Sequence, residues 1–207
     1  MTKEEARGML GISPSKVMLL AMATSGKFGG YPVLLDILSP VLDACPDAIF
    51  IGVGAFPFNC YPEKFNRDQM LFTQPLHGRD ASHYHIAADI HIDSFPFTSL
   101  TSALETMMGS GGVVLGYCPW NSTSTHDMNL ILCIEPDDYA PSSSILTHAT
   151  IKAYQQTLTK LLSDPALLHD MQQKGRQGLQ RHMGQLWTEE MNGVYDQVLK
   201  VDRRPRT

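Results

Sequence analysis

The sequence predicts an α/β protein with a doubly wound parallel sheet and C-terminal helices. Three observations lead to this fold class. Short apolar runs of strand length, such as "KVMLLAMA" at 16–23 and "DAIFIGVG" at 47–54, are typical of parallel strands buried on both faces. Segments with helical spacing separate these runs, an alternation that indicates a parallel sheet covered by helices on both sides. From about residue 144 onward the whole pattern is helical.

The individual elements follow from the same patterns. Helices are predicted at 2–12, 31–45, 80–88 and 99–108, and strands at 16–23, 47–54, 69–74, 89–93, 111–116 and 130–135. The aromatic and proline-rich segment 55–66 is predicted to be a loop. The C-terminal helical segment covers about 144–201.

Local signals place several helix ends. Thr2 is a candidate N-cap for the first helix. Pro40 lies inside the second predicted helix, which it should end or kink. Near the C-terminus, Ser163 or Asp164 can cap a helix whose first residue is Pro165.

Composition and charge exclude several classes of protein. The 207 residues, 43% of them hydrophobic, suit one compact domain. With a net charge of -5, no broad nucleic-acid-binding surface is expected. No apolar run is long enough to span a bilayer, and the N-terminus lacks the apolar core of a secretory signal. The four cysteines show no CxxC pair and no zinc spacing, so we expect reduced thiols, a cytoplasmic location and no bound metal.

The loops at the carboxyl ends of the strands are the candidate sites, because ligands of doubly wound sheets bind there. Lys27 lies in one of them, the small-residue loop "TSGKFGG" after the first strand. A lysine in this place can meet a phosphate group. The spacing is not GxxxxGK[ST], so we exclude an ordinary P-loop ATPase or kinase. The alternative interpretation is a solvated loop lysine.

Hydroxyl side chains gather at the start of the predicted helix in "FPFTSLTSALE" (95–105). Ser99, Thr101 and Ser102 lie where free N–H groups and the positive end of the helix dipole attract phosphate. Glu105 follows one turn later and can accept hydrogen bonds from a ribose diol. The alternative is a capping box, in which Ser102 caps the helix and Glu105 is its third residue.

The histidines of "SHYHIAADIHID" (82–93) raise the question of a metal site. His91 and Asp93 share a face if their segment is a strand. His83 and His85 fall on a different predicted element, and no HExxH motif is present. We therefore predict packed or solvated histidines here.

The order of these pieces resembles the C-terminal, nucleotide-sugar-binding half of GT-B glycosyltransferases. Four stretches carry the resemblance, which spans nearly the whole chain: 2–54, 77–97, 98–116 and 130–183. The resemblance implies a Rossmann-like sheet, as a single GT-B half, and a nucleoside-diphosphate sugar as donor substrate. The hydroxyl-rich "TSLTSALE" is closest in style to O-GlcNAc transferase and its bacterial protein-glucosylating relatives.

The resemblance also implies a role for individual residues. Lys27 would contact the diphosphate, and Glu105 would hold the ribose hydroxyls. Thr101 and Ser102 would bind phosphate oxygens, and the backbone around Gly78 and Arg79 would face the base. The expected site therefore has Lys27 and Glu105 as catalytic residues, no metal, and substrate contacts from Thr24, Ser25, Gly26, Gly78, Arg79, Ser99, Leu100, Thr101 and Ser102.

Two positions depart from the group 1 pattern. Many retaining enzymes carry two glutamates separated by seven residues, and Phe97 stands at the first of these positions. Those enzymes often have an arginine five residues before the lysine, where this chain has Met22. The choice between retaining and inverting chemistry therefore stays open.

The resemblance leads to one leading expectation for function. Residues 1–207 would form the donor-binding domain of a glycosyltransferase that uses a nucleoside-diphosphate sugar, with UDP favoured, and needs no cofactor. We expect the N-terminal acceptor domain to be absent from this chain, which would be inactive without it. The acceptor is a glycan, protein or lipid of unknown identity. Two alternatives remain: half of a sugar-nucleotide 2-epimerase, and a non-catalytic flavodoxin-like interaction domain in which Glu105 only caps a helix.

Overall fold

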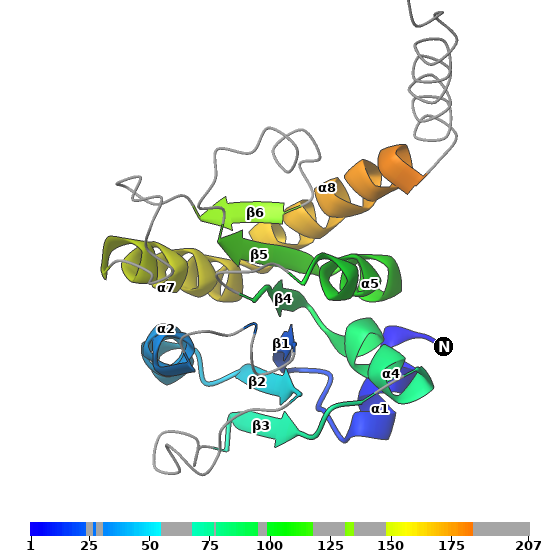
Figure 1. Ribbon diagram of the computed structural model, residues 1–207, viewed down its shortest axis with the longest axis horizontal. Helices are drawn as coiled ribbons and strands as arrows, with labels where there is room; N and C mark the ends of the chain where they lie inside the picture. The colour runs from blue at the N-terminus through cyan, green and yellow to red at the C-terminus, as the bar shows by residue number, and fades with distance from the viewer. Residues whose placement is uncertain are drawn as a thin grey trace, which may run out of the picture.

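The fold was analysed in a computed structural model, which describes residues 1–23, 27, 31–54, 68–76, 78–94, 99–117, 131–134 and 148–183 (Figure 1). A six-stranded sheet forms its centre, in the order β3-β2-β1-β4-β5-β6. Every neighbouring pair of strands is parallel. The strands are β1 (Val17–Met22), β2 (Ala48–Val53), β3 (Met70–Thr73), β4 (Ile90–Ile92), β5 (Val113–Tyr117) and β6 (Ile131–Ile134). The predicted parallel sheet is therefore confirmed.

Helices cover both faces of this sheet (Figure 1). On one face lie α2 (Tyr31–Ala44) and α7 (His148–Ser163), which pack against each other. On the other lie α1 (Lys3–Leu10), α4 (Arg79–Ala87) and α5 (Leu100–Ser110), and α8 (Pro165–Met183) packs beside α5. This arrangement is the predicted doubly wound fold. Among the described residues, no helix is long and apolar enough to cross a membrane.

The alternating burial of strand side chains explains the two layers. Leu19, Ala21 and Phe50 belong to the core cluster under α2 and α7. Met18 and Leu20 belong to the cluster on the opposite face, with Ala6 of α1 and Ala87 of α4. Because successive side chains of a strand point to opposite faces, a continuous apolar run can supply both cores.

The predicted helix signals are mostly confirmed, with one correction. Thr2 caps α1 in a capping box with Glu5. Asp164 accepts a hydrogen bond from the Leu167 amide at the start of α8 (3.0 Å). Pro40, however, does not end α2, which continues to Ala44. Its ring lies on the exposed side of a helix whose other face is buried in the core, so packing offsets the lost backbone hydrogen bond.

A buried arginine fastens α1 to the amino-terminal edge of the sheet. The Arg7 guanidinium donates to the carbonyl oxygens of Ala87, Pro14 and Lys16. It also pairs with the Asp89 carboxylate, which accepts a further hydrogen bond from the Met18 amide. This cluster lies at the opposite end of the strands from the predicted site.

Candidate functional site

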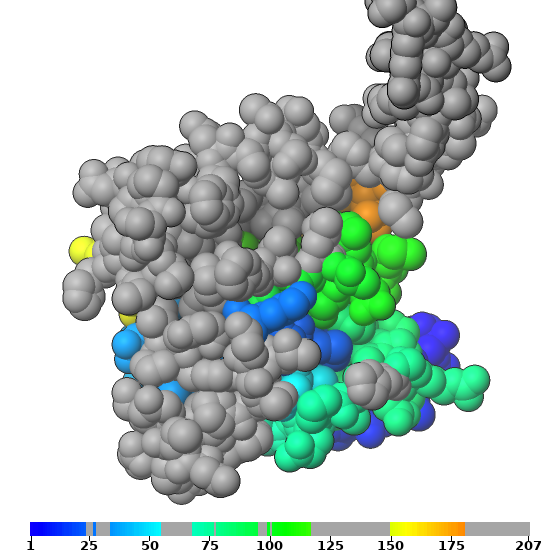
Figure 2. All heavy atoms as spheres, in the orientation of Figure 1, coloured from blue at the N-terminus to red at the C-terminus, as the bar shows by residue number. Residues whose placement is uncertain are grey.

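A pocket lined by described residues lies where the strand order reverses. β1 and β4 are neighbours in the sheet, but the chain leaves β1 toward α2 on one face and leaves β4 toward α5 on the other. Such a switch point opens a crevice at the carboxyl ends of the strands. The pocket here has a volume of about 630 Å³ and is lined by residues that follow β1, residues of α4 and the segment before it, and residues of α5. Figure 2 shows these three parts of the chain adjoining on one face.

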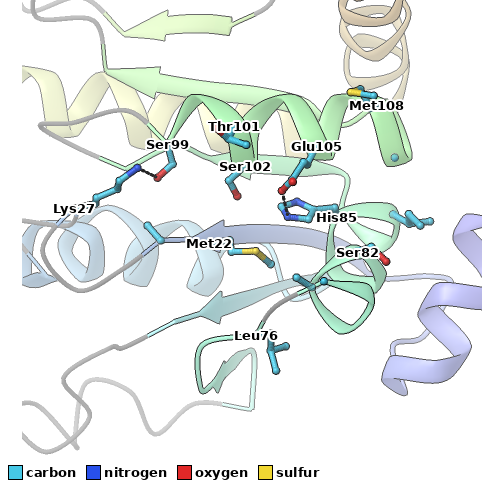
Figure 3. A pocket seen from close by; sticks show the side chains of 15 residues that line it. Met22, Lys27, Leu76, Ser82, His85, Ser99, Thr101, Ser102, Glu105 and Met108 are labelled. Atoms are coloured by element: carbon cyan, nitrogen blue, oxygen red, sulfur yellow. Dashed lines mark hydrogen bonds and ion pairs between the residues drawn. The ribbon is translucent and has the colours of Figure 1, made fainter.

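Lys27 and Ser99 connect the two sides of the switch point. The Lys27 ammonium group donates to Ser99 Oγ at 3.2 Å, as Figure 3 shows. Ser99 Oγ lies 2.9 Å from Ser94 Oγ, and the Ser99 amide donates to Asp93 Oδ1 at 2.7 Å. Asp93 is 2% exposed and also accepts from the Ser94 amide. The buried carboxylate therefore holds Ser99 in place through its backbone, and the serine hydroxyl orients the lysine.

The first turn of α5 faces the same pocket. The helix begins at Leu100 after Ser99, whose side chain does not cap it. Since the first N–H groups of a helix have no partner within the helix, the amides of this turn are available to a ligand. Ser102 is the third residue of the helix, so the proposed capping box of Ser102 and Glu105 is wrong. The buried Ser102 hydroxyl has no hydrogen-bond partner within the described part of the chain.

Glu105 lies one turn further along α5 and meets a histidine of α4. Its Oε2 atom is 3.1 Å from Nε2 of His85 (Figure 3). The Glu105 side chain is 56% exposed, whereas that of His85 is only 4% exposed. The contact has the length of an ion pair without the alignment of a hydrogen bond. Burial lowers the pKa of His85, and the Glu105 carboxylate opposes this shift.

A second histidine lies behind the first. Nδ1 of His85 and Nδ1 of His91 are 2.8 Å and 3.1 Å from the hydroxyl oxygen of Thr106. Burial lowers the pKa of His91 to about 3, with a further contribution from His85. Both imidazoles are packed between α4, α5 and β4, as the sequence predicted. No group of three or more potential metal ligands gathers in the described ranges.

The structure brings together most of the predicted site residues that it describes. Six of them line the pocket: Lys27, Gly78, Ser99, Thr101, Ser102 and Glu105. Arg79, the first residue of α4, is exposed and does not line it. Leu100 begins α5, but its side chain is not among those described. Thr24, Ser25 and Gly26 lie outside the described residues, as do the predicted loop 55–66 and Phe97.

The residues behind this pocket were not predicted from the sequence. His85 was expected only to be packed or solvated, and no role was predicted for Thr106 or Asp93. A usable signal existed for Asp93, a polar residue directly after an apolar strand, at an edge where ligands bind. His85 carried no such signal, because its approach to Glu105 depends on how α4 packs on α5.

Comparison with solved structures identifies the fold. WaaG, a glycosyltransferase involved in lipopolysaccharide biosynthesis, matches 84% of this chain with a TM-score of 0.66 at 17% sequence identity. The C-terminal domain of LpcC, a group 1 family glycosyl transferase from Francisella tularensis, matches 89% of this chain with a TM-score of 0.64 at 16% identity. The fold is that of the C-terminal half of a GT-B glycosyltransferase.

The extent of these matches differs between the proteins. This chain spans 94% of the LpcC domain but only 45% of WaaG. The pneumococcal O-GlcNAc transferase GtfA, solved in complex with UDP and GlcNAc, matches 89% of this chain and 36% of its own length (TM-score 0.63, 15% identity). At sequence identities this low, the structural similarity shows a shared fold and nothing further. No protein-family model and no curated protein sequence matches the chain.

Proposed function

We propose that this chain is the donor-binding domain of a glycosyltransferase and binds the nucleoside diphosphate of a sugar donor in the switch-point pocket. One observation carries the proposal: a lysine from the loop after β1, an uncapped helix start and a carboxylate one turn later line the same pocket. These groups come from separate segments of the chain. Their convergence at the carboxyl edge of the sheet offers a cation and free amides for phosphates, and an acceptor for ribose hydroxyls.

The chemistry required of such a site is stabilisation of a leaving diphosphate. When the bond between the sugar and the diphosphate breaks, negative charge develops on the departing phosphate oxygens. Lys27 and the first amides of α5 are placed to offset that charge, together with the helix dipole. The Ser102 hydroxyl, which lacks a partner among the described residues, can donate to a phosphate oxygen. Glu105 would bind the ribose and so hold the donor in the orientation that the reaction needs.

Several finer features belong to the same proposal. UDP is the favoured nucleotide, with support from GtfA, which was solved with UDP. The site would work without a metal or other cofactor, because the helix start and Lys27 supply the positive charge. The acceptor would bind to a second domain or a partner chain, a view supported by the chain's match to 45% of WaaG. We place this reaction in the cytoplasm.

Calorimetric titration of the chain with UDP, GDP and ADP tests the proposal. We expect one of them to bind, with UDP tightest. Replacing Lys27 by Met removes a charge-assisted contact and should weaken binding about 10- to 100-fold. Glu105→Ala should weaken it by about tenfold. Lys174→Met, which alters an exposed ion pair on α8, is the matched control and should leave binding unchanged.

Two outcomes would count against this function. If no nucleoside diphosphate binds at ~1 mM, the pocket is not a donor site, and a non-catalytic interaction domain becomes the better description. If a nucleotide binds but neither Lys27→Met nor Glu105→Ala changes its affinity, the nucleotide lies elsewhere. A thermal-shift series with the same nucleotides gives an independent readout, because a ligand of the native state raises the melting temperature.

A further inference from the structure

The Glu105 carboxylate is exposed, and within the described ranges His85 is the side chain that contacts it. A glutamate side chain with more than half of its surface in solvent loses conformational entropy when it is fixed in one orientation. The described contact that fixes it comes from Nε2 of His85 on the neighbouring helix, 3.1 Å away (Figure 3). The proposed ribose ligand is therefore oriented by a side chain that is itself buried.

The hydrogen bonds behind His85 restrict its tautomer. The Thr106 hydroxyl can donate one hydrogen bond, and three possible acceptors lie near it: Nδ1 of His85, Nδ1 of His91 and the carbonyl oxygen of Ser102 at 3.1 Å. An imidazole nitrogen that does not accept this proton can instead donate its own to the hydroxyl oxygen. If both imidazoles donated from Nδ1, a neutral His85 would direct the lone pair of Nε2 at the Glu105 carboxylate. Two electron-rich atoms 3.1 Å apart repel each other, so this arrangement is unfavourable.

The opposite arrangement removes this repulsion and pairs both imidazoles with Thr106, although the Thr106 hydroxyl then gives up its hydrogen bond to the Ser102 carbonyl oxygen. Thr106 donates its proton to Nδ1 of His85, which then carries its own proton on Nε2 and presents it to Glu105. His91 donates from Nδ1 to the Thr106 oxygen. Its buried Nε2, which has no partner in the described part of the chain, is then a bare acceptor and not an unpaired N–H donor. A lone acceptor is the less costly of the two in a buried place.

We propose that His85 is a positioning residue of the pocket, whose Nε2–H lies 3.1 Å from Glu105 Oε2 and, by electrostatic attraction without hydrogen-bond alignment, holds that carboxylate in the orientation that receives the ribose of the donor. Thr106 and His91 act through His85, because they set which nitrogen carries its proton. His85 also lines the pocket, but in this arrangement the contact with the ribose is made by Glu105, the more exposed of the two side chains. This inference rests on the proposed function, because the role of His85 is to orient the carboxylate that would bind the donor.

The charged and titratable groups around His85 indicate that it acts on Glu105 and not on another acidic group. Glu105 approaches it from α5, and His91 lies beside it with the two ring centroids 6.5 Å apart. The nearby cation of α1, Arg7, is engaged by Ala87 O and Asp89 and not by His85. Among the described residues, Glu105 is thus the acidic group placed to receive the His85 proton.

Two substitutions of His85 separate this positioning from a purely structural role. The side-chain nitrogen of glutamine can reach the place of Nε2, whereas that of asparagine reaches only the place of Nδ1. His85→Gln should therefore keep UDP affinity within about twofold of the unchanged protein. His85→Asn, which keeps a polar group near Thr106 but loses the contact with Glu105, should weaken UDP binding about five- to tenfold.

A double-mutant cycle with Glu105→Ala shows whether His85 acts through the carboxylate. Without Glu105, His85→Asn should cause no further loss of UDP affinity. Nitrogen-15 NMR of the imidazole supplies a readout that does not depend on the ligand: His85 should carry its proton on Nε2 in the unchanged protein. A proton on Nδ1 would overturn the inference, and so would an equal loss of affinity in His85→Asn with and without Glu105.

The failure of this inference can be told from the failure of the proposed function. If UDP, GDP and ADP all fail to bind the unchanged chain, both fall. If UDP binds and Glu105→Ala weakens it, but His85→Asn binds as tightly as the unchanged protein, only the positioning role is overturned. Equal weakening by His85→Gln and His85→Asn also overturns it, because a structural defect would then explain both.

Discussion

Near the pocket, Gly54 is the position where the addition of a single methyl group should lower the free energy of unfolding most. It follows β2 and has a φ of +134°, a conformation that residues with a side chain rarely adopt. A Cβ atom built there would lie 2.1 Å from the carbonyl oxygen of Ala23. Ala23 ends the described segment after β1 and lines the pocket. The ends of the strands therefore approach too closely for alanine.

The expected cost of Gly54→Ala follows from two terms. Strained backbone conformations of this kind cost on the order of 1–3 kcal/mol. Relief of the overlap requires the ends of β1 and β2 to move apart, which strains the hydrogen bond from Ala23 N to Val53 O (3.2 Å). A shift of Gly54 also strains the bond from its own amide to Thr73 O of β3 on the other side (3.1 Å). Each such bond is worth about 1 kcal/mol. The sum is a loss of ~3–5 kcal/mol, a large part of the stability of an ordinary domain.

Urea denaturation followed by circular dichroism measures this loss. Gly8→Ala is a matched control, because Gly8 lies on the exposed side of α1 and a Cβ there meets no atom within 4 Å. That substitution should stabilise the protein by ~0.5–1 kcal/mol through better helix propensity. If Gly54→Ala changes the free energy of unfolding by less than ~1 kcal/mol, the argument from close approach is wrong.

Two further predictions concern buried polar groups. Arg7→Met should lower the free energy of unfolding by ~2–4 kcal/mol, because the carbonyl oxygens of Ala87, Pro14 and Lys16 lose their donor, whereas Asp89 keeps Lys3 and the Met18 amide as partners. A loss no larger than the ~0–0.5 kcal/mol expected for Lys174→Met would refute this. In the native state the pKa of His91 is lowered from 6.5 to about 3. Below pH 6.5 the unfolded state therefore binds more protons than the native state, so the stability that is present above pH 6.5 is lost as the pH falls. Denaturation at about pH 4.5 should show a loss of ~2–3 kcal/mol from this group. His91→Asn should remove most of that dependence, and an unchanged pH profile in the variant would contradict the assignment.

Much of the fold could be predicted because its signals are local. Apolar runs such as 17–22 and 48–53 are long enough for strands and are flanked by loop residues. The caps at Thr2 and Asp164 need only neighbouring residues to form. At Pro40 a local rule predicted that the helix would either end or kink, and the helix does not end there. The packing of α2 against the core kept the helix intact beyond it.

The candidate site was predictable in its position and less so in its contacts. Lys27 and Ser99 were expected at the same edge of the sheet, because parallel strands align their carboxyl ends. Their direct hydrogen bond places them in one pocket. The capping box at Ser102 failed because α5 begins at Leu100, and the true start depends on Asp93 holding the Ser99 amide.

By itself the sequence determined the alternation of strands and helices, and with it the edge of the sheet where polar and small residues gather. Periodicity and capping act over a few residues, so they can be recognised without coordinates. Only the tertiary structure decided that Glu105 meets His85, and that Thr106 and His91 stand behind it. Those side chains lie on α5, α4 and β4, and nothing in the spacing of the chain encodes how closely two helices pack side by side on one face of a sheet. The carboxylate that lines the pocket could be found in the sequence, but its histidine partner could be identified only from the packing of the helices.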